Sequence, residues 1–323
     1  MASYQVGSTG PEVAEIQRKL AGLGLYAGPL DGKFGGGTEA AVVAFQRAGA
    51  LDVDGKVGDQ TWKALFGSSA APAPAIVKQP LAYRCLALAG SIETGAAPPE
   101  CFAGLSGDFD GQGISFGALQ FALGPGSLGE FLRALEQRAP ACIDDVFHDN
   151  AGVLRAVLKE PIDQQLDWAR SIQHAAHHQL DEPWQGMFKT LGRRAECQNL
   201  QVEFAQRRFA AAQAMCSEYG LWSERGVALM FDVVVQNGSI GPLVKAQIQQ
   251  DFAALTDLPR EALEVARLES IARRRAAVCK PQWVADVLAR KLTIADGAGV
   301  IHGRQYNLAD DYGIRLVDVQ PVA

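Results

Sequence analysis

The chain has 323 residues, of which 48% are hydrophobic and 20% are charged, and its formal net charge is −6. This length predicts two domains, the larger of which can bury a core of its own. No run approaches the roughly 20 apolar residues of a membrane span, and Met1 leads into polar sequence without a signal-peptide-like region. We therefore expect no membrane insertion and no secretion leader, and the charge argues against nucleic acid and anionic membranes as partners.

The cysteines give no sign of a metal centre or of a disulfide scaffold. They stand at positions 85, 101, 142, 197, 216 and 279, without a CxxC pair. Such spacing predicts thiols that are mostly reduced and buried. A disulfide between Cys85 and Cys101 stays open as an alternative, and we expect no cofactor and no metal.

The first predicted element is a helix that follows Pro11 and ends near Gly22 and Gly24. Helical spacing places four side chains on one face of it: Val13, Ile16, Gln17 and Leu20. That face is expected to pack against the residues that follow.

An internal repeat comes next, because DGKFGGGTEAAVVAF at 31–45 returns as DGKVGDQTWKALF at 54–66. In each copy Asp-Gly predicts a tight turn that leads into a helix. Thr38 and Thr61 stand where the hydroxyl of an N-cap residue is expected. The repeat therefore predicts a bundle of three short helices.

Residues 3–67 resemble the small three-helix peptidoglycan-binding module of many bacterial and phage cell-wall enzymes. GSTGPEVAEIQRKLAGLGLY and the DGKFG and DGKVGDQTW turns carry this resemblance. It implies contacts with glycan or stem peptide by turn and surface residues, for which the candidates are Asp31, Lys33, Thr38, Gln46, Asp54, Thr61 and Trp62. Trp62 suits a core position equally well, and a bundle that only spaces or solubilises its neighbour is the alternative function.

The sequence SSAAPAPA at 68–75 is small and rich in proline, which is typical of a semi-extended linker. We therefore divide the chain into a binding module at 1–67, a linker at 68–79 and a second domain at 80–323. The second domain is predicted to be helical.

The second domain opens with an apolar helical pattern that ends in Glu93. Two neighbouring faces are formed by Leu81, Cys85, Leu88 and Ile92 and by Ala82, Leu86, Ala89 and Glu93. A carboxyl group at the edge of a core is kept protonated by partial burial, as a general acid requires. A solvated glutamate at a helix end is the alternative.

The glycine-rich run GDFDGQGISFGALQF follows, with Asp108 and Asp110 in an acidic turn. Ile114, Phe116 and Ala118 alternate with Ser115 and Gly117, which predicts a half-buried strand and hence a β-hairpin beside the helix. Two carboxyl groups across a cleft are the apparatus that cleaves a glycosidic bond. DFDGQG is a poor calcium loop, because the further oxygen ligands and the late glutamate are missing.

SIETG followed by this run resembles the catalytic helix and hairpin of the lysozyme superfamily, closest to the chitosanase-like family 46 glycoside hydrolases, whose hairpin reads DGRGYTAG. The resemblance implies a mainly α chain, in which a three-helix wall-binding bundle is linked to a larger lysozyme-like domain with a small β-hairpin beside the catalytic helix. It makes Glu93 the general acid, Asp110 the general base and Ser115 a residue that holds the attacking water. Asp108 is the second candidate for the base.

The stretch 205–238 is similar to the long central helix pair of the same family, with its break at Gly220 and Leu221. The closing segment 273–303 resembles the final helices and a glycine-rich turn. The substrate-binding residues implied by these likenesses are Gln112, Gln120, Asp232 and Asn237. A polar contact between helices and a helix C-cap are the alternatives for the last two, and Gln112 departs from the arginine of DGRG.

Together these features predict a monomeric phage-type endolysin, made in the host cytoplasm, that hydrolyses the β-1,4 bond between N-acetylmuramic acid and N-acetylglucosamine of peptidoglycan with inversion. A secreted enzyme whose leader has been removed would have the same sequence features. A lytic transglycosylase that uses Glu93 alone, a chitosanase-like hydrolase and a non-catalytic wall-binding protein stay open. A zinc enzyme built on His174, His177 and His178 is disfavoured, because HAAHH lacks the glutamate of HExxH and a polar helix face explains it.

Overall fold

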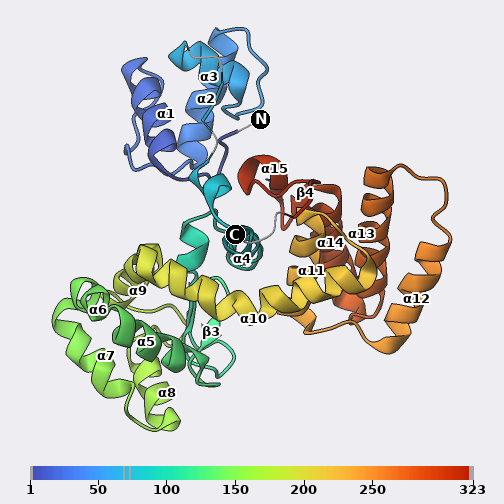
Figure 1. Cartoon of the computed structure of the whole chain (residues 1–323). Coiled ribbons are helices and arrows are strands. Elements are labelled where there is room, and N and C mark those ends of the chain that lie inside the picture. Colours follow the sequence, from blue (N-terminus) through green and yellow to red (C-terminus); the bar gives the residue numbers. More distant parts are fainter. Residues whose placement is uncertain (1–2, 68–69, 73, 320–323) are drawn as a thin grey trace. The chain divides into compact units, whose positions relative to one another are not determined.

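The computed structural model describes residues 3–67, 70–72 and 74–319, which are mainly helical, so the predicted fold class is confirmed (Figure 1). The chain divides into two compact units, Met1–Cys85 with Arg207–Ala323, and Leu86–Gln206. Both divisions fall inside helices, namely α4 (Leu81–Thr94) and α10 (Ala195–Tyr219). The predicted limits at residues 67 and 80 follow the linker composition instead and stay a prediction.

The N-terminal module consists of α1 (Pro11–Gly22), α2 (Gly36–Ala48) and α3 (Asp59–Phe66), drawn in blue in Figure 1. Its first helix buries the four predicted side chains, Val13, Ile16, Gln17 and Leu20. Tyr4, Phe34 and Trp62 complete the core, and the rings of Tyr4 and Trp62 lie 5.9 Å apart. The predicted bundle of three helices is therefore confirmed.

The predicted helix caps are wrong. Helices α2 and α3 begin two residues before Thr38 and Thr61, after the glycine N-caps Gly35 and Gly58, and without a side-chain cap. The two hydroxyls are buried within the first turns instead, where each is held by a glutamine side chain.

The segment after the module is partly packed. Residues 68, 69 and 73 of the predicted linker lie outside the described residues. Ala71 is buried and its backbone N–H donates to Asp59 Oδ1 at 2.9 Å, while the Tyr4 hydroxyl donates to Pro72 O at 2.6 Å. A short 3₁₀ turn, η1 (Ala75–Lys78), then leads to α4.

The unit Leu86–Gln206 contains a small antiparallel sheet in the order β1-β2-β3. The strands are β1 (Leu105–Ser106), β2 (Ser115–Phe116) and β3 (Phe121–Ala122), preceded by η2 (Glu100–Ala103). The predicted hairpin therefore has a third strand. The middle strand ends two residues earlier than the alternation indicated, because Gly117 adopts a φ of +82° and starts a turn.

Helices cover this sheet and form the core of the unit. They are α5 (Ser127–Arg138), α6 (Pro140–Phe147), η3 (His148–Asn150), α7 (Ala151–Val157), α8 (Ile162–Ser171) and α9 (Trp184–Arg193). Phe116 lies at the centre of the core, with its ring 5.6 Å from that of Phe188 and 6.2 Å from that of Phe131. The sheet is thus fixed to the helices by aromatic packing.

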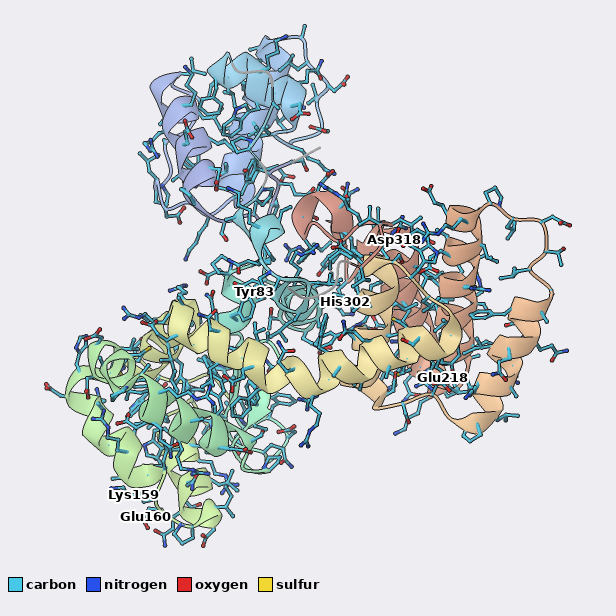
Figure 2. All side chains as sticks on the ribbon, viewed as in Figure 1. Tyr83, Lys159, Glu160, Glu218, His302 and Asp318 are labelled. Atoms are coloured by element: carbon cyan, nitrogen blue, oxygen red, sulfur yellow. The ribbon has the colours of Figure 1, made fainter. Side chains whose placement is uncertain are left out.

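The rest of the chain continues from α10 through the predicted break, where Gly220 adopts a φ of +64°. It forms α11 (Glu224–Asn237), α12 (Pro242–Ala253), α13 (Arg260–Ala277), η4 (Pro281–Trp283), α14 (Val284–Asp296), β4 (Ala298–Ile301), β5 (Arg304–Asn307) and α15 (Leu308–Asp311). Helix α14 packs against α11, α13 and β4. The turn between β4 and β5 carries His302, which is labelled in Figure 2. His302 Nε2 pairs with Asp286 Oδ1 at 2.6 Å.

The six cysteines are thiols in the structure, so Cys85 and Cys101 do not form a disulfide. Five are buried, as predicted, and Cys279 is half-buried. None of the helices in the described part of the chain is long and apolar enough to cross a membrane.

Candidate functional site

The end of α4 lies directly against the small sheet. A Cβ atom on Gly90 would come within 2.6 Å of the Ala118 Cβ, and one on Gly104 would overlap the Thr94 side chain. Both positions need glycine because helix and sheet approach so closely. The predicted arrangement of a short β structure beside the helix that ends in SIET is therefore present.

Glu93 lies in the last turn of α4 with an exposed side chain. The expected partial burial is wrong, because Ser91 and Ile92 are buried whereas the Glu93 side chain lies on the exposed side of the last turn. Thr94 closes the helix by donating its hydroxyl hydrogen to Gly90 O at 2.7 Å, and Gly95 turns the chain away with a φ of +67°. The carboxyl group is accessible to a ligand but is not held in an apolar environment.

The two aspartates of the acidic turn differ in accessibility. Asp110 is exposed, and its Oδ1 accepts a hydrogen bond from Gln112 N at 3.1 Å, which is a local turn contact. Asp108 uses both oxygens: Oδ1 accepts from Gly113 N and Oδ2 from Arg170 Nε, each at 2.9 Å. Of the two, Asp110 is the carboxylate that a water or a substrate can reach.

The charge of Asp108 is stabilised by these partners. Burial alone would raise the pKa of Asp108, but the hydrogen bonds from Gly113 and Arg170 and the charge of Arg170 outweigh it and hold that pKa below its usual range. Asp108 therefore fastens the turn, and it is the weaker candidate for the base.

The acidic turn is clamped by a segment that sequence reasoning did not connect with it. Gln173 Oε1 accepts from Asp108 N at 2.8 Å, and a Cβ on Gly107 would overlap Gln173 and the carbonyl of His178. Arg170 and Gln173 stand 62 and 65 residues beyond Asp108, so no local spacing could have indicated them. At the tip of the clamped turn, the Phe109 side chain is 68% exposed.

The histidine segment forms a turn, so the predicted polar helix face is wrong. His174 Nδ1 accepts from the backbone N–H groups of Ala176 and His177, and the rings of His174 and His177 stack at 4.6 Å. No group of three His, Cys, Asp or Glu side chains suited to a metal ion occurs in the described ranges.

The other polar residues predicted around the sheet have mixed environments. Gln112 is exposed, and Ser115 is half-buried on β2. Gln120 adopts a φ of +50°, donates from Nε2 to Gly117 O at 2.8 Å and accepts from Ser106 Oγ at 3.3 Å, so it fastens the turn between β2 and β3. Sequence reasoning missed Gln201, a buried residue of α10.

Gln201 fixes the same turn from the other side. Its Oε1 accepts from Ala118 N at 2.8 Å and its Nε2 donates to Phe102 O at 2.9 Å. A buried amide that satisfies two backbone groups in this way specifies the loop conformation. The turn next to α4 is thus held by the side chains of Gln120 and Gln201.

Asp232 does not face a cleft, so the expected substrate contact is corrected. Its side chain is 2% exposed and pairs with Arg290 Nη2 and Lys291 Nζ, each at 2.7 Å. Burial opposes ionisation, but the two cations hold the pKa of Asp232 below its usual range. Asn237 is exposed at the end of α11, where Gly238 adopts a positive φ and closes the helix.

Two equivalent glutamines organise the module at the N-terminus. Gln17 and Gln46 are fully buried, and each donates from Nε2 to a carboxylate, a backbone carbonyl and a hydroxyl while its Oε1 accepts a glycine N–H. The partners are Asp31, Lys33, Thr38 and Gly32 for the first, and Asp54, Lys56, Thr61 and Gly55 for the second. The repeat in the sequence is thus a repeated hydrogen-bond network.

This network decides which predicted wall-binding residues are accessible. Thr38, Thr61 and Trp62 are buried, so they support the fold. Asp31, Lys33 and Asp54 are exposed.

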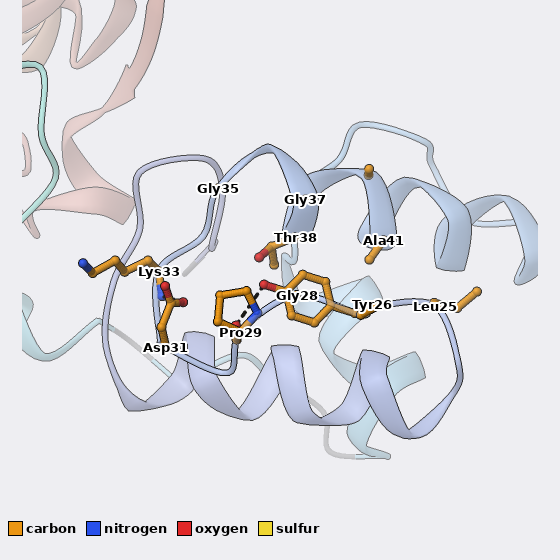
Figure 3. A pocket seen from close by; sticks show the side chains of 12 residues that line it. Leu25, Tyr26, Gly28, Pro29, Asp31, Lys33, Gly35, Gly37, Thr38 and Ala41 are labelled. Carbon is orange, nitrogen blue, oxygen red and sulfur yellow. Dashed lines mark hydrogen bonds between the residues drawn. The ribbon is translucent and has the colours of Figure 1, made fainter.

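A pocket of about 480 Å³ lies beside the first turn of this network (Figure 3). Tyr26 and Pro29 form one wall, and Gly37 and Thr38 of α2 lie opposite, with Asp31 and Lys33 nearby. The Tyr26 hydroxyl donates to Pro29 O at 3.0 Å, which fixes the ring. The hydrogen bonds from Lys33 N and Gln17 hold the pKa of Asp31 below its usual range.

Comparisons with known proteins identify relatives of the module. Residues 9–65 match the family model described as "Putative peptidoglycan binding domain". The spore cortex-lytic enzyme of Oceanobacillus iheyensis is 40% identical over 65 residues, which are 20% of this chain and 24% of that protein. The Bacillus subtilis spore cortex-lytic enzyme is 44% identical over 66 residues, 20% of this chain and 22% of that protein.

A third relative is the N-acetylmuramoyl-L-alanine amidase CwlM of Mycobacterium tuberculosis, 36% identical over 76 residues. The matched region spans 20% of this chain and 19% of that protein, so the chain covers about a fifth to a quarter of these relatives.

Among solved structures, a chitosanase complex aligns with a TM-score of 0.43 and 16% identity over 70% of this chain and 95% of that chain. The structure of chitosanase OU01 with substrate aligns with a TM-score of 0.42 and 17% identity over 70% of this chain and 94% of that chain. These values are too low to transfer individual residues. The chain thus carries an N-terminal peptidoglycan-binding domain related to the modules of spore cortex-lytic enzymes, followed by a larger helical part.

Proposed function

We propose that the protein is a peptidoglycan hydrolase of the lysozyme type, which cleaves the β-1,4 bond between N-acetylmuramic acid and N-acetylglucosamine. The peptidoglycan-binding domain and its relatives among cell-wall lytic enzymes support the choice of polymer. The observation that carries the chemistry is the position of two accessible carboxyl groups. Glu93 ends the helix that packs on the small sheet, and Asp110 lies on the loop of that sheet.

In the proposed reaction Glu93 gives its proton to the glycosidic oxygen as the bond from this oxygen to C1 breaks. Asp110 accepts a proton from a water molecule near Ser115, and the water oxygen attacks C1 from the opposite face. This inverting route has carboxyl groups about 6.5 to 9.5 Å apart. Because Glu93 is exposed in the free protein, we expect the bound glycan to exclude water from it.

The clamp on the acidic turn supports the choice of Asp110 as base. Asp108 is bound to Gly113 and Arg170, so its oxygens are committed to holding the loop. Asp110 sits in the same preorganised loop with a side chain open to solvent. A fixed loop reduces the reorganisation that the reaction requires.

A lytic transglycosylase is the second candidate, because that reaction needs a single acid at the position of Glu93 and no base.

We further propose that the protein acts as an endolysin, made in the cytoplasm of a phage-infected host and acting as a monomer on the wall.

Conservative variants of the two carboxylates test the roles. Glu93→Gln should reduce turnover of purified peptidoglycan by about 10³-fold or more, because the proton donor is lost while the shape is kept. Asp110→Asn should reduce it by about 10²-fold or more in an inverting hydrolase. Release of soluble muropeptides is the measurement, and binding to sacculi should be unchanged in both variants.

Glu160→Gln is a suitable control, since Glu160 is an exposed carboxylate of the same unit outside the site (Figure 2). Full activity of Asp110→Asn together with loss in Glu93→Gln would favour the transglycosylase. Full activity of Glu93→Gln would contradict both candidates.

A further inference from the structure

The two repeats of the N-terminal module provide an internal comparison. Gln17 and Gln46 make the same four hydrogen bonds to equivalent partners, so both turns fold for the same physical reasons. Gln17 additionally donates from Nε2 to the Tyr26 hydroxyl at 3.3 Å. A difference between the repeats is therefore not required by the shared fold.

The first difference is a longer connection in the first repeat. Gln17 and Asp31 are 14 residues apart, whereas Gln46 and Asp54 are 8 apart, so the first repeat has 14 − 8 = 6 additional residues. This longer connection contains Tyr26 and Pro29, which form a wall of the pocket. The second repeat has no counterpart of this wall.

The second difference is the glycine run at the start of α2. Gly36 and Gly37 correspond to Asp59 and Gln60 of the second repeat, which begin α3 with side chains. Neither glycine has a positive φ, and a Cβ would meet nothing within 4 Å at Gly36 and only the Tyr26 ring, at 3.7 Å, at Gly37. Glycine is among the least favourable residues in a helix, so Gly36 and Gly37 lower the stability of the first turn of α2. The backbone conformation there does not require glycine.

What the glycine run does provide is access to the pocket. Gly35 and Gly37 line it, and a Cβ at Gly37 would already contact the Tyr26 ring at 3.7 Å, so a larger side chain there would take up room in the pocket. The first-turn N–H groups of α2, which have no side-chain cap, stay open to an acceptor from a ligand.

We propose that this pocket is the glycan-binding site of the module and that it holds an N-acetylhexosamine unit of the strand. The assignment rests on the proposed function and names the part of peptidoglycan that is bound. The methyl of the acetamido group packs on Tyr26 and Pro29, and its carbonyl accepts from the first turn of α2. Asp31 accepts from sugar hydroxyls.

The charge and size of the pocket favour this ligand over the stem peptide. The charges of Asp31 and Lys33 cancel, which suits a neutral sugar rather than a peptide with several carboxylates. A volume of about 480 Å³ is in the range of small-ligand pockets.

A pocket-filling variant tests the site in the full-length chain. Gly37→Leu should weaken binding of N-acetylchitotetraose by about tenfold or more, equivalent to about 1.4 kcal/mol, in isothermal titration calorimetry. The melting temperature should stay the same or rise, because leucine replaces glycine in a helix. The titration is done in the Glu93→Gln background, which prevents turnover of the ligand, and cellotetraose, which lacks acetamido groups, should not bind.

Two matched controls come from the chain itself. Gly36→Leu changes the neighbouring residue, which does not line the pocket, and Gln60→Leu changes the equivalent position of the second repeat. Both should bind the tetrasaccharide within about twofold of the unsubstituted chain.

Each other outcome is decisive. Unchanged tetrasaccharide binding in Gly37→Leu overturns the proposed pocket, as does equal loss in Gly36→Leu. Binding of a free stem peptide in place of the tetrasaccharide assigns the pocket to peptide and overturns the sugar. If the unsubstituted chain fails to bind purified sacculi, the proposed function fails and not only its assignment to this pocket.

Discussion

Asp311 in α15 shows how burial of one residue couples stability to pH. Its Oδ2 accepts from Asn307 N at 2.9 Å. Burial raises the pKa of Asp311 to about 6 although this hydrogen bond and Arg304 oppose the shift. The folded protein therefore holds a proton on Asp311 more tightly than the unfolded chain does. The stability that comes from this proton is fully present below a pH of about 4 and is lost as the pH rises through about 6.

Asp311→Asn should remove this dependence. An amide keeps an acceptor for Asn307 N but does not ionise, so the variant should be more stable at pH 7.5 by about 3 kcal/mol. Below pH 4 the two proteins should have nearly the same free energy of unfolding. Urea unfolding at both pH values measures this, and an equal difference at the two values would contradict the assignment to Asp311.

Single residues were predicted with unequal success, and Glu93 and Asp232 show why. Helical spacing places a side chain around a helix axis, but it does not say what covers that face. Glu93 lies on the exposed side of the last turn of α4, whereas Asp232 is buried because Arg290 and Lys291 supply counter-charges from α14. Those partners stand 58 and 59 residues further along the chain, beyond the reach of any local pattern.

At the scale of elements, the clamped acidic turn leads to a testable coupling. Asp108 and Arg170 join the turn to α8, and we expect both to hold Asp110 in place rather than to take part in the reaction. Arg170→Ala and Asp108→Asn should each lower kcat on peptidoglycan about tenfold and leave binding to sacculi unchanged. The double variant should lose little more than either single variant, because the residues act through one contact.

The kinetic measurement has a clear control. Arg193→Ala, on α9, removes a comparable ion pair with Glu100 of η2 and should leave kcat within about twofold. Losses that multiply in the Asp108 and Arg170 double variant would show that the two residues act independently, contrary to the clamp.

Elements whose signals are local were predicted correctly. The apolar spacing of α1 and the helix break at Gly220 are encoded within a few residues, and both are present. The third strand and the glycine N-caps were missed or wrong, because distant contacts determine them. The buried Thr38 hydroxyl, for example, is committed to Gln17, 21 residues earlier. The turn at His174 was also wrong, although its hydrogen bonds to Ala176 and His177 are local.

At the scale of the whole molecule, the sequence predicted a mainly helical chain, which the structure has, and an N-terminal peptidoglycan-binding module, whose family model matches residues 9–65. Composition placed a boundary in the linker, but the compact units divide inside α4 and α10. A segment rich in alanine and proline indicates a linker between packed regions, but composition does not indicate which distant segments share a core. The catalytic roles of Glu93 and Asp110 stay predictions.

The measurement that tests the central claim most directly is mass spectrometry of the products from purified peptidoglycan. If the protein is a lysozyme-type hydrolase, digestion should release muropeptides that end in reducing N-acetylmuramic acid, and Glu93→Gln should release none. Products with anhydro-N-acetylmuramic acid, products with reducing N-acetylglucosamine, or no products at all would contradict the claim.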